Sequence, residues 1–197
     1  YSNGLSKIGE AGDFITAPEI SPLFSMALGN HIADVLRQIP AADCLEFGAG
    51  NGQMAVDILQ YLQEIDCLPA RYYIIEASAY LRHRQQEIVH KHFGSEQDRI
   101  IWLDQLPAEF TGVIIANEVC DAMPVHRVQF EENQILELGT GREEGQLTWL
   151  SQTVTDPFLQ TRCEQIYPLL QQFPYQTEVA MQAPAWLGTI AEILTQG

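Results

Sequence analysis

A glycine-rich turn is the sharpest chemical pattern in the sequence. The run Glu46-Phe47-Gly48-Ala49-Gly50-Asn51-Gly52 joins a short apolar segment, residues 43–47, to a helix-like segment, residues 54–65. Glycines let the backbone turn tightly and approach a ligand closely, and the start of a helix offers free N–H groups. Unless the turn only packs a helix against a sheet, the motif predicts a cofactor held by Glu46, Gly48, Gly50 and Gly52.

Acids at the ends of the next two expected strands extend this pattern. Glu76 closes the segment 71–76, where a carboxylate can accept hydrogen bonds from both ribose hydroxyls of an adenosine ligand. Asp104 follows the segment 99–103 and can accept from an adenine amino group, or it can simply start a loop.

The spacing of the glycines indicates which cofactor is bound. Gln53 stands where a dinucleotide fingerprint has its third glycine, which argues against a nicotinamide-dependent oxidoreductase. The G-x-G-x-G spacing, with an acid two residues before it, favours S-adenosyl-L-methionine. A methyltransferase would release S-adenosyl-L-homocysteine as its product. No pattern of metal ligands is evident, because His90 and His92 do not face each other on a helix.

Two carboxylates follow the fourth expected strand, residues 112–116. Asn117, Glu118 and Asp121 should face the cofactor's methyl group, because ligands of open α/β sheets bind beyond the carboxyl ends of the strands. Glu118 and Asp121 can hold a cationic nucleophile and orient its lone pair for in-line attack. They can also pair with a guanidinium. The alternative is that Asn117 or Glu118 caps a helix. We interpret the three residues as the candidate catalytic group.

The elements that would position these residues alternate between strand and helix. Helices expected at 22–38, 54–65 and 79–93 separate or precede the four strands. Strands separated by helices of this length predict βαβ units with right-handed crossovers. The expected fold class is therefore α/β, a Rossmann-like parallel sheet with helices on both faces.

After Pro124 the pattern changes to an inserted antiparallel region. It contains a hairpin at 125–130 and 134–138, a third strand at 146–150, and helices at 156–167 and 184–194. We therefore divide the chain into three parts. They are an N-terminal loop and helix beside the cofactor pocket (1–40), a cofactor-binding core (41–124), and an inserted substrate or partner region (125–197).

The composition and net charge of the chain limit the classes of molecule that it can be expected to bind. The net charge of −16 repels phosphate backbones and argues against nucleic acid. It favours a cationic substrate such as a protein's arginine, unless the acidity serves only solubility. Four widely spaced cysteines predict reduced thiols in a cytosol-like compartment. No apolar run is long enough to span a bilayer. We expect a soluble intracellular protein without membrane insertion.

Three motifs carry a resemblance to a known family. The run from Ser6 to Pro22 resembles the opening signature of the MidA family, as do Glu46–Gly52 and Asn117-Glu118 followed by Asp121-Ala122-Met123-Pro124-Val125. That family consists of S-adenosylmethionine-dependent protein arginine methyltransferases linked in mitochondria to the assembly of respiratory complex I. The resemblance runs from end to end of the chain.

The resemblance implies a substrate, a location and further pocket residues. It implies a class I methyltransferase acting on an arginine of a respiratory-chain subunit or its bacterial equivalent. The location would be the mitochondrial matrix in a eukaryote and the cytoplasm in a bacterium. It also implies that residues before the first helix help wall the cofactor pocket, namely Gly12, Asp13, Thr16, Pro18 and Glu19. Val119-Cys120 departs from the two aromatic residues usual in the family.

The resemblance also implies a longer protein. Tyr1 would start inside a longer N-terminal region, and further strands would follow Gly197. The sheet edge beyond the fourth strand would then be unpaired in this chain. Such a chain would bind its cofactor weakly, recruit a second copy as a homodimer, or be inactive. A different hypothesis is a cofactor-binding assembly factor that holds its partner through residues 125–197, with methylation incidental or lost.

Overall fold

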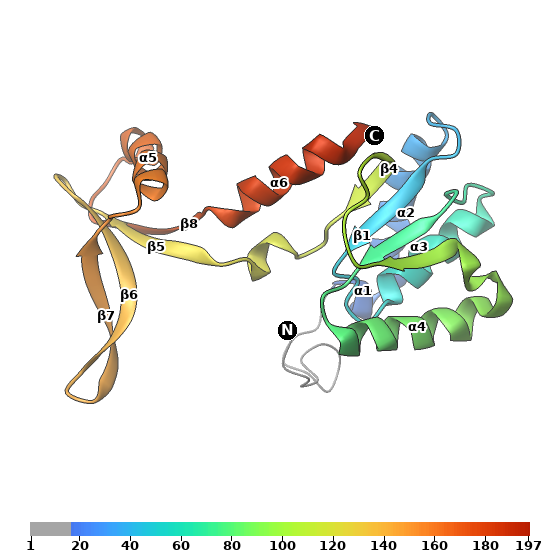
Figure 1. Cartoon of the computed structure of the whole chain (residues 1–197), viewed down its shortest axis with the longest axis horizontal. Helices are drawn as coiled ribbons and strands as arrows, with labels where there is room; N and C mark the ends of the chain where they lie inside the picture. Colours follow the sequence, from blue (N-terminus) through green and yellow to red (C-terminus); the bar gives the residue numbers. More distant parts are fainter. Residues whose placement is uncertain (1–16) are drawn as a thin grey trace. The chain divides into compact units, whose positions relative to one another are not determined.

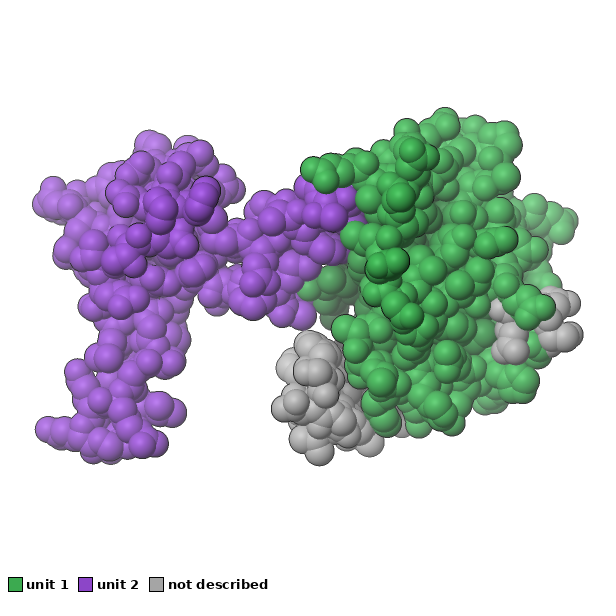
Figure 2. Space-filling model, viewed as in Figure 1, with its two compact units in different colours: residues 1–119, 191–197 green, residues 120–190 purple. Residues whose placement is uncertain are grey.

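The computed structural model describes residues 17–197, which form two compact units (Figures 1 and 2). The described part of the first unit comprises residues 17–119 and 191–197, and the second unit comprises residues 120–190. The last seven residues thus belong with the first unit, so the region 125–197 expected from the sequence is not one structural piece.

A parallel sheet forms the centre of the first unit. Its strands lie in the order β3-β2-β1-β4-β9, and every neighbouring pair is parallel. The strands are β1 (Asp43–Phe47), β2 (Tyr72–Ile75), β3 (Ile100–Leu103), β4 (Phe110–Ile115) and β9 (Leu194–Gln196). The α/β fold expected from the sequence is confirmed. The chain reverses its direction of winding between β1 and β4, and open parallel sheets bind ligands at such a point.

Helices precede β1 and connect the strands from β1 to β3. They are α1 (Ala17–Ile20), α2 (Pro22–Leu36), α3 (Gln53–Glu64), α4 (Ala79–Phe93) and the short 3₁₀ helix η1 (Gly94–Arg99). The start of α2 follows its sequence signal, because the Ser21 side chain accepts a hydrogen bond from the Leu23 N–H at 3.2 Å and Pro22 lies in the first turn.

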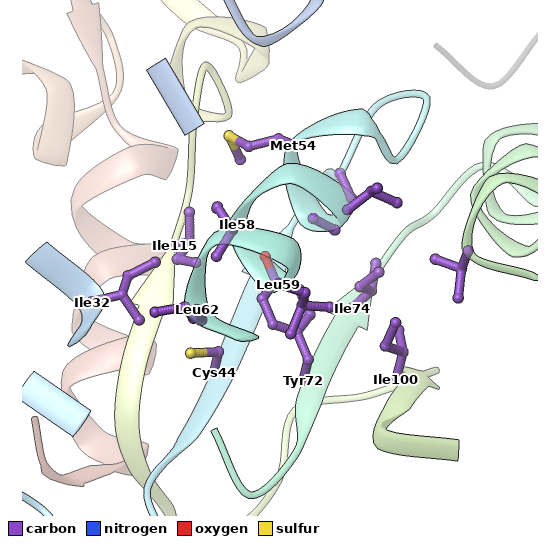
Figure 3. Close-up of a cluster of buried hydrophobic side chains, with 14 of the residues drawn as sticks. Ile32, Cys44, Met54, Ile58, Leu59, Leu62, Tyr72, Ile74, Ile100 and Ile115 are labelled. Carbon is purple, nitrogen blue, oxygen red and sulfur yellow. The ribbon is translucent and has the colours of Figure 1, made fainter. Parts of the chain in front are cut away.

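The core of the first unit fixes α3 against the sheet. Met54, Ile58, Leu59 and Leu62 lie on the buried face of α3 and pack with side chains of the strands (Figure 3). Each such aliphatic side chain contributes about 2 kcal/mol of hydrophobic stabilisation on burial. Because this contact is extensive, the first turn of α3 and the loop that leads into it are held in place.

The second unit contains an antiparallel sheet in the order β7-β6-β5-β8. Its principal elements are β5 (Val125–Phe130), β6 (Ile135–Glu143), β7 (Gln146–Thr153), α5 (Pro157–Ile166) and β8 (Tyr175–Ala180). The expected hairpin and third strand are confirmed, and helix α5 lies within the expected segment 156–167. Short 3₁₀ helices, η2 (Cys120–Ala122) and η3 (Tyr167–Leu169), precede β5 and follow α5.

One edge of the parallel sheet differs from the expectation. Helix α6 (Gln182–Ile193) ends directly at β9, and β9 pairs with β4 through Phe110 and Leu194. The Thr195 hydroxyl also donates to the Phe110 carbonyl at 2.9 Å. The expectation that the edge beyond β4 is unpaired is therefore wrong. A strand of three residues is too short to show a periodic pattern, so the sequence pattern predicts only a helix that ends at residue 194.

Candidate cofactor site

The glycine turn after β1 has a backbone that only glycines adopt easily. Gly48, Gly50 and Gly52 have φ values of 62°, 56° and 91°, in the left-handed region. A β-carbon on Gly52 would lie 2.9 Å from the Ile88 methyl carbon, whereas one on Gly50 would meet nothing within 4 Å. Gly52 therefore allows α4 to pack closely, and Gly50 leaves room for a ligand to approach the backbone.

Glu19 lies against the glycine turn. Its Oε1 accepts a hydrogen bond from the Asn51 side-chain amide at 2.7 Å, and the Asn51 Oδ1 accepts from the Gln53 N–H at 2.9 Å. Pro18 is buried in the same short helix, α1. The structure thus places Glu19 beside the turn, while Pro18 is buried one residue earlier in the chain. Gly12, Asp13 and Thr16 lie outside the described residues.

Glu76 follows β2 and is held through both carboxylate oxygens. Oε1 accepts from the Ser78 N–H at 2.8 Å, and Oε2 accepts from the Gln85 side-chain amide at 3.0 Å. The same Gln85 amide group donates to the Gly50 carbonyl at 2.9 Å. The structure therefore brings Glu76 and the glycine turn together through Gln85.

Gln85 is a residue that the sequence analysis missed. It lies on α4, is fully buried, and accepts a hydrogen bond from the Trp102 indole N–H at 3.0 Å. The signal was available, because Gln85 occupies a helical position between Leu81 and Val89 that an apolar residue would ordinarily take. A glutamine there needs buried polar partners.

Asp104 has a partner that the sequence did not indicate. It follows β3, its side chain is 85% exposed, and it forms an ion pair with Arg82. Arg82 also donates to the Trp102 carbonyl at 3.1 Å. An exposed ion pair of this kind stabilises a fold by less than about 1 kcal/mol. The carboxylate is therefore held beyond β3 while retaining lone pairs for a further hydrogen bond.

Glu46 is a buried acid at the end of β1. Its side chain is 0% exposed, Oε2 accepts from the Tyr72 hydroxyl at 2.7 Å, and Oε1 has no hydrogen-bond partner among the described residues. Burial raises the pKa of Glu46 to about 7; the Tyr72 hydrogen bond lowers this pKa and the charge of Glu76 raises it further. A buried oxygen without a partner is rare, and it fits a ligand that brings a donor or a cation to this position.

The raised pKa of Glu46 predicts how the stability depends on pH. The folded state takes up a proton near pH 7 and the unfolded state near 4.5, so the folded state binds more protons between these values. The contribution of Glu46 to the free energy of unfolding should therefore be largest below pH 4.5 and should be lost as the pH rises to 7, a fall of about 3 kcal/mol in this contribution. Glu46→Gln should lack this component in urea denaturation.

An exposed acid on the same part of the fold provides the control for this measurement. Glu64 ends α3 and is exposed, so Glu64→Gln should keep the pH dependence of the wild type. A difference between the wild type and Glu46→Gln that stays constant across the interval would show that Glu46 titrates normally.

The segment after β4 begins beside the glycine turn. β1 and β4 are neighbours, and a Val119 methyl carbon lies 3.6 Å from the place of a β-carbon on Gly48. Glu118 is exposed and has a φ of 51°, a left-handed conformation that is strained for a residue other than glycine. Such strain often occurs at functional sites.

The helix-cap alternative for Asn117 and Glu118 is not supported. The next helical element is η2, a three-residue 3₁₀ helix that begins at Cys120, so neither residue caps an α-helix. Asp121 lies in η2, is exposed, and belongs to the second unit, whereas Asn117 and Glu118 belong to the first.

Three further observations concern metals, membranes and cysteines. Among the side chains that the structure describes, no group of three or more His, Cys, Asp or Glu residues is arranged to hold a metal ion. No helix in the described part of the chain is long and apolar enough to cross a membrane. The four cysteines are free thiols, and Cys44 and Cys163 are buried.

The parallel sheet, the glycine turn after β1 and the acid after β2 define a class I S-adenosylmethionine-dependent methyltransferase fold. Residues 27–197 match the family described as "Putative S-adenosyl-L-methionine-dependent methyltransferase", and the chain belongs to this family. The family expected from the sequence is confirmed, and its cofactor is S-adenosyl-L-methionine.

Two solved structures share the fold over nearly the whole chain. A crystal structure from Burkholderia thailandensis with S-adenosyl-homocysteine bound has a TM-score of 0.85 and 32% identity, covering 96% of this chain and 49% of that chain. A native crystal structure from the same organism has a TM-score of 0.79 and 33% identity, covering 94% of this chain and 49% of that one.

Curated relatives share part of the sequence. "Protein arginine methyltransferase NDUFAF7 homolog, mitochondrial" of Drosophila melanogaster is 27% identical over 149 residues, which is 64% of this chain and 34% of that protein. "Protein arginine methyltransferase NDUFAF7, mitochondrial" of Danio rerio is 26% identical over 151 residues, or 64% of this chain and 36% of that protein. The matched regions span about a third of these relatives.

Proposed function

We propose that this protein transfers the methyl group of S-adenosyl-L-methionine to an arginine side chain of another protein. The observation that carries the proposal is the arrangement around Glu76. Its carboxylate is oriented by hydrogen bonds to both oxygens and is joined to the glycine turn through Gln85. This arrangement suits the ribose and the amino-acid end of one extended cofactor.

Each side chain at the carboxyl ends of the strands has a distinct part in the proposed site. Glu76 accepts from the ribose hydroxyls, and Asp104 accepts from the adenine amino group. The glycine turn receives the amino-acid end of the cofactor, where Glu46 Oε1, which has no hydrogen-bond partner in the part of the chain that the structure describes, accepts from the ammonium group. Glu19 forms the adjoining wall through its hydrogen bond to Asn51.

The proposed chemistry requires a nucleophile held in line with the reactive methyl group. When bound, the cofactor would supply a methyl group on a positively charged sulfur: a nitrogen lone pair would bond to the methyl carbon, and the bond to sulfur would break to leave the thioether S-adenosyl-L-homocysteine. Glu118, with Asn117, pairs with the guanidinium, directs its lone pair along the line of attack and accepts the proton that leaves the nitrogen. The strained backbone at Glu118 supports this role for the residue.

We propose arginine on a protein as the methyl acceptor because of the names of the relatives and the net charge of this chain. The curated relatives bear the name protein arginine methyltransferase, and they are mitochondrial proteins. The net charge of −16 favours a cationic partner and disfavours nucleic acid. We place the protein in the mitochondrial matrix if its source is a eukaryote, and in the cytoplasm if its source is a bacterium.

Two measurements test this function. Calorimetric titration should show binding of S-adenosyl-L-methionine and S-adenosyl-L-homocysteine and no binding of NAD. Tritium from the labelled methyl group should then enter protein, and acid hydrolysis should release it as methylarginine. Binding of NAD alone would contradict the cofactor site. Label recovered on another amino acid would leave a methyltransferase but contradict the arginine specificity.

A partner-holding function is a second candidate, and one observation favours it. The edge strand β7 exposes Leu147 and Trp149, at 80% and 54% of their surfaces, and exposed apolar side chains of this kind often mark protein contacts. The two functions separate in Glu118→Ala. If methylation is essential, this variant should lose function while it still forms a complex with its partner.

A further inference from the structure

Gln85 connects three separate parts of the proposed cofactor site. Its side-chain NH₂ donates to the Gly50 carbonyl at 2.9 Å and to the Glu76 Oε2 at 3.0 Å, while its Oε1 accepts from the Trp102 indole N–H at 3.0 Å. The residue is 0% exposed, so its own amide atoms are shielded from bulk water. One amide group thus joins the turn after β1, the acid after β2 and the strand β3.

The polarity of the amide allows only one orientation in this position. The NH₂ group faces two acceptors and the oxygen faces a donor, which satisfies the amide's main hydrogen-bonding groups. A half-turn of the amide would set its oxygen against a carboxylate and a carbonyl, and its NH₂ against an N–H group. Because unsatisfied buried polar groups are costly, the Trp102 N–H fixes the direction in which Gln85 donates.

This fixed direction has a consequence for the ligand. The Ser78 N–H occupies one lone pair of Glu76 Oε1, and Gln85 occupies one lone pair of Oε2. Each oxygen keeps a second lone pair, and the two held bonds define the plane in which these lone pairs lie. We propose that Gln85 is a positioning residue that orients the Glu76 carboxylate toward both ribose hydroxyls of the cofactor. This inference rests on the proposed function.

Two substitutions at Gln85 test this role. Gln85→Leu keeps most of the volume and removes all three hydrogen bonds. Gln85→Glu keeps the shape but sets a carboxylate against Glu76 and the Gly50 carbonyl. The neighbouring Gln86 is exposed on the same helix, so Gln86→Leu and Gln86→Glu are matched controls. Urea denaturation of each variant establishes that it is folded at the temperature of the binding measurement.

The readout is affinity for two ligands, S-adenosyl-L-homocysteine and its 2′,3′-dideoxy analogue, measured by calorimetry. Gln85→Leu should bind S-adenosyl-L-homocysteine about tenfold more weakly, and Gln85→Glu more weakly still. Neither variant should lose affinity for the analogue, which has no ribose hydroxyls. In a Glu76→Gln background, Gln85→Leu should cause no further loss, because its effect acts through the Glu76 carboxylate.

Each alternative result has a distinct meaning. Equal losses for both ligands would show a packing defect and overturn the positioning role, as would wild-type affinity in Gln85→Glu. Additive losses in the double variant would also overturn it. If the wild-type protein binds neither ligand, the proposed function itself fails and this inference fails with it.

Discussion

Glu76→Ala is expected to weaken the binding of S-adenosyl-L-homocysteine roughly 1000-fold in a calorimetric titration. Two ribose hydroxyls would each donate to a charged carboxylate, and each such bond contributes about 2 kcal/mol, so the pair contributes about 4 kcal/mol. The geometry supports two bonds because both oxygens of Glu76 are already oriented by the protein. Glu76→Gln should show a smaller loss, because its amide retains one acceptor oxygen.

Glu87 provides the matched control for this prediction. It lies on α4 with its side chain 58% exposed, in contacts with His83 and Arg84, so Glu87→Ala should bind the ligand as the wild type does. Glu76→Ala also removes the acceptor of the Ser78 N–H, and circular dichroism should therefore verify its fold. Wild-type affinity in a folded Glu76→Ala protein would place the ribose elsewhere.

The parallel part of the fold follows directly from the sequence. β1, β2, β3 and β4 are short apolar runs between helical segments, and their side chains are mostly buried or half-buried. Strands of this kind read as continuous hydrophobic runs, which are easy to recognise. The glycine turn could be located for a related reason, since its conformation needs φ > 0 at three positions and glycines supply it.

Two strands carried too little local signal to be found. β9 has only three residues, and its existence depends on pairing with β4, which lies far away in the sequence. β8 buries one residue fully, Val179, and partly buries Thr177 and Ala180, so its alternation is faint. Both strands are determined by long-range hydrogen bonds, and a pattern of residues in one short window does not record such partners.

In the candidate site, too, some features follow from local sequence patterns and others depend on long-range contacts. Glu46 and Glu76 could be proposed because each stands at the end of a recognisable strand. Gln85 could not be paired with Glu76 in advance, because that contact depends on how α4 packs across Gly52. The partner of Asp104 also comes from α4. Sequence patterns located the acids, and tertiary packing determines how their oxygens are oriented.

Glu118→Gln is expected to lower the rate of methyl transfer roughly 1000-fold in single-turnover assays, within the range typical of a general base. The substitution keeps the shape of the side chain and removes the charge that would hold a guanidinium and accept its proton. Binding of S-adenosyl-L-homocysteine should stay within about twofold of the wild type, because the free-energy loss falls on the transition state. The assay uses the methyl acceptor identified by tritium labelling.

Glu118→Gly tests whether the strained backbone serves the reaction. Glycine adopts a φ of 51° without strain, so the free energy of unfolding of this variant should be about 1 kcal/mol higher than that of the wild type. Its rate of methyl transfer should fall as far as that of Glu118→Gln. Glu109, exposed just before the amino end of β4, is the matched control, because Glu109→Gln changes an equivalent charge at the opposite end of the same strand. Wild-type rates in Glu118→Gln would assign the proton transfer to another group.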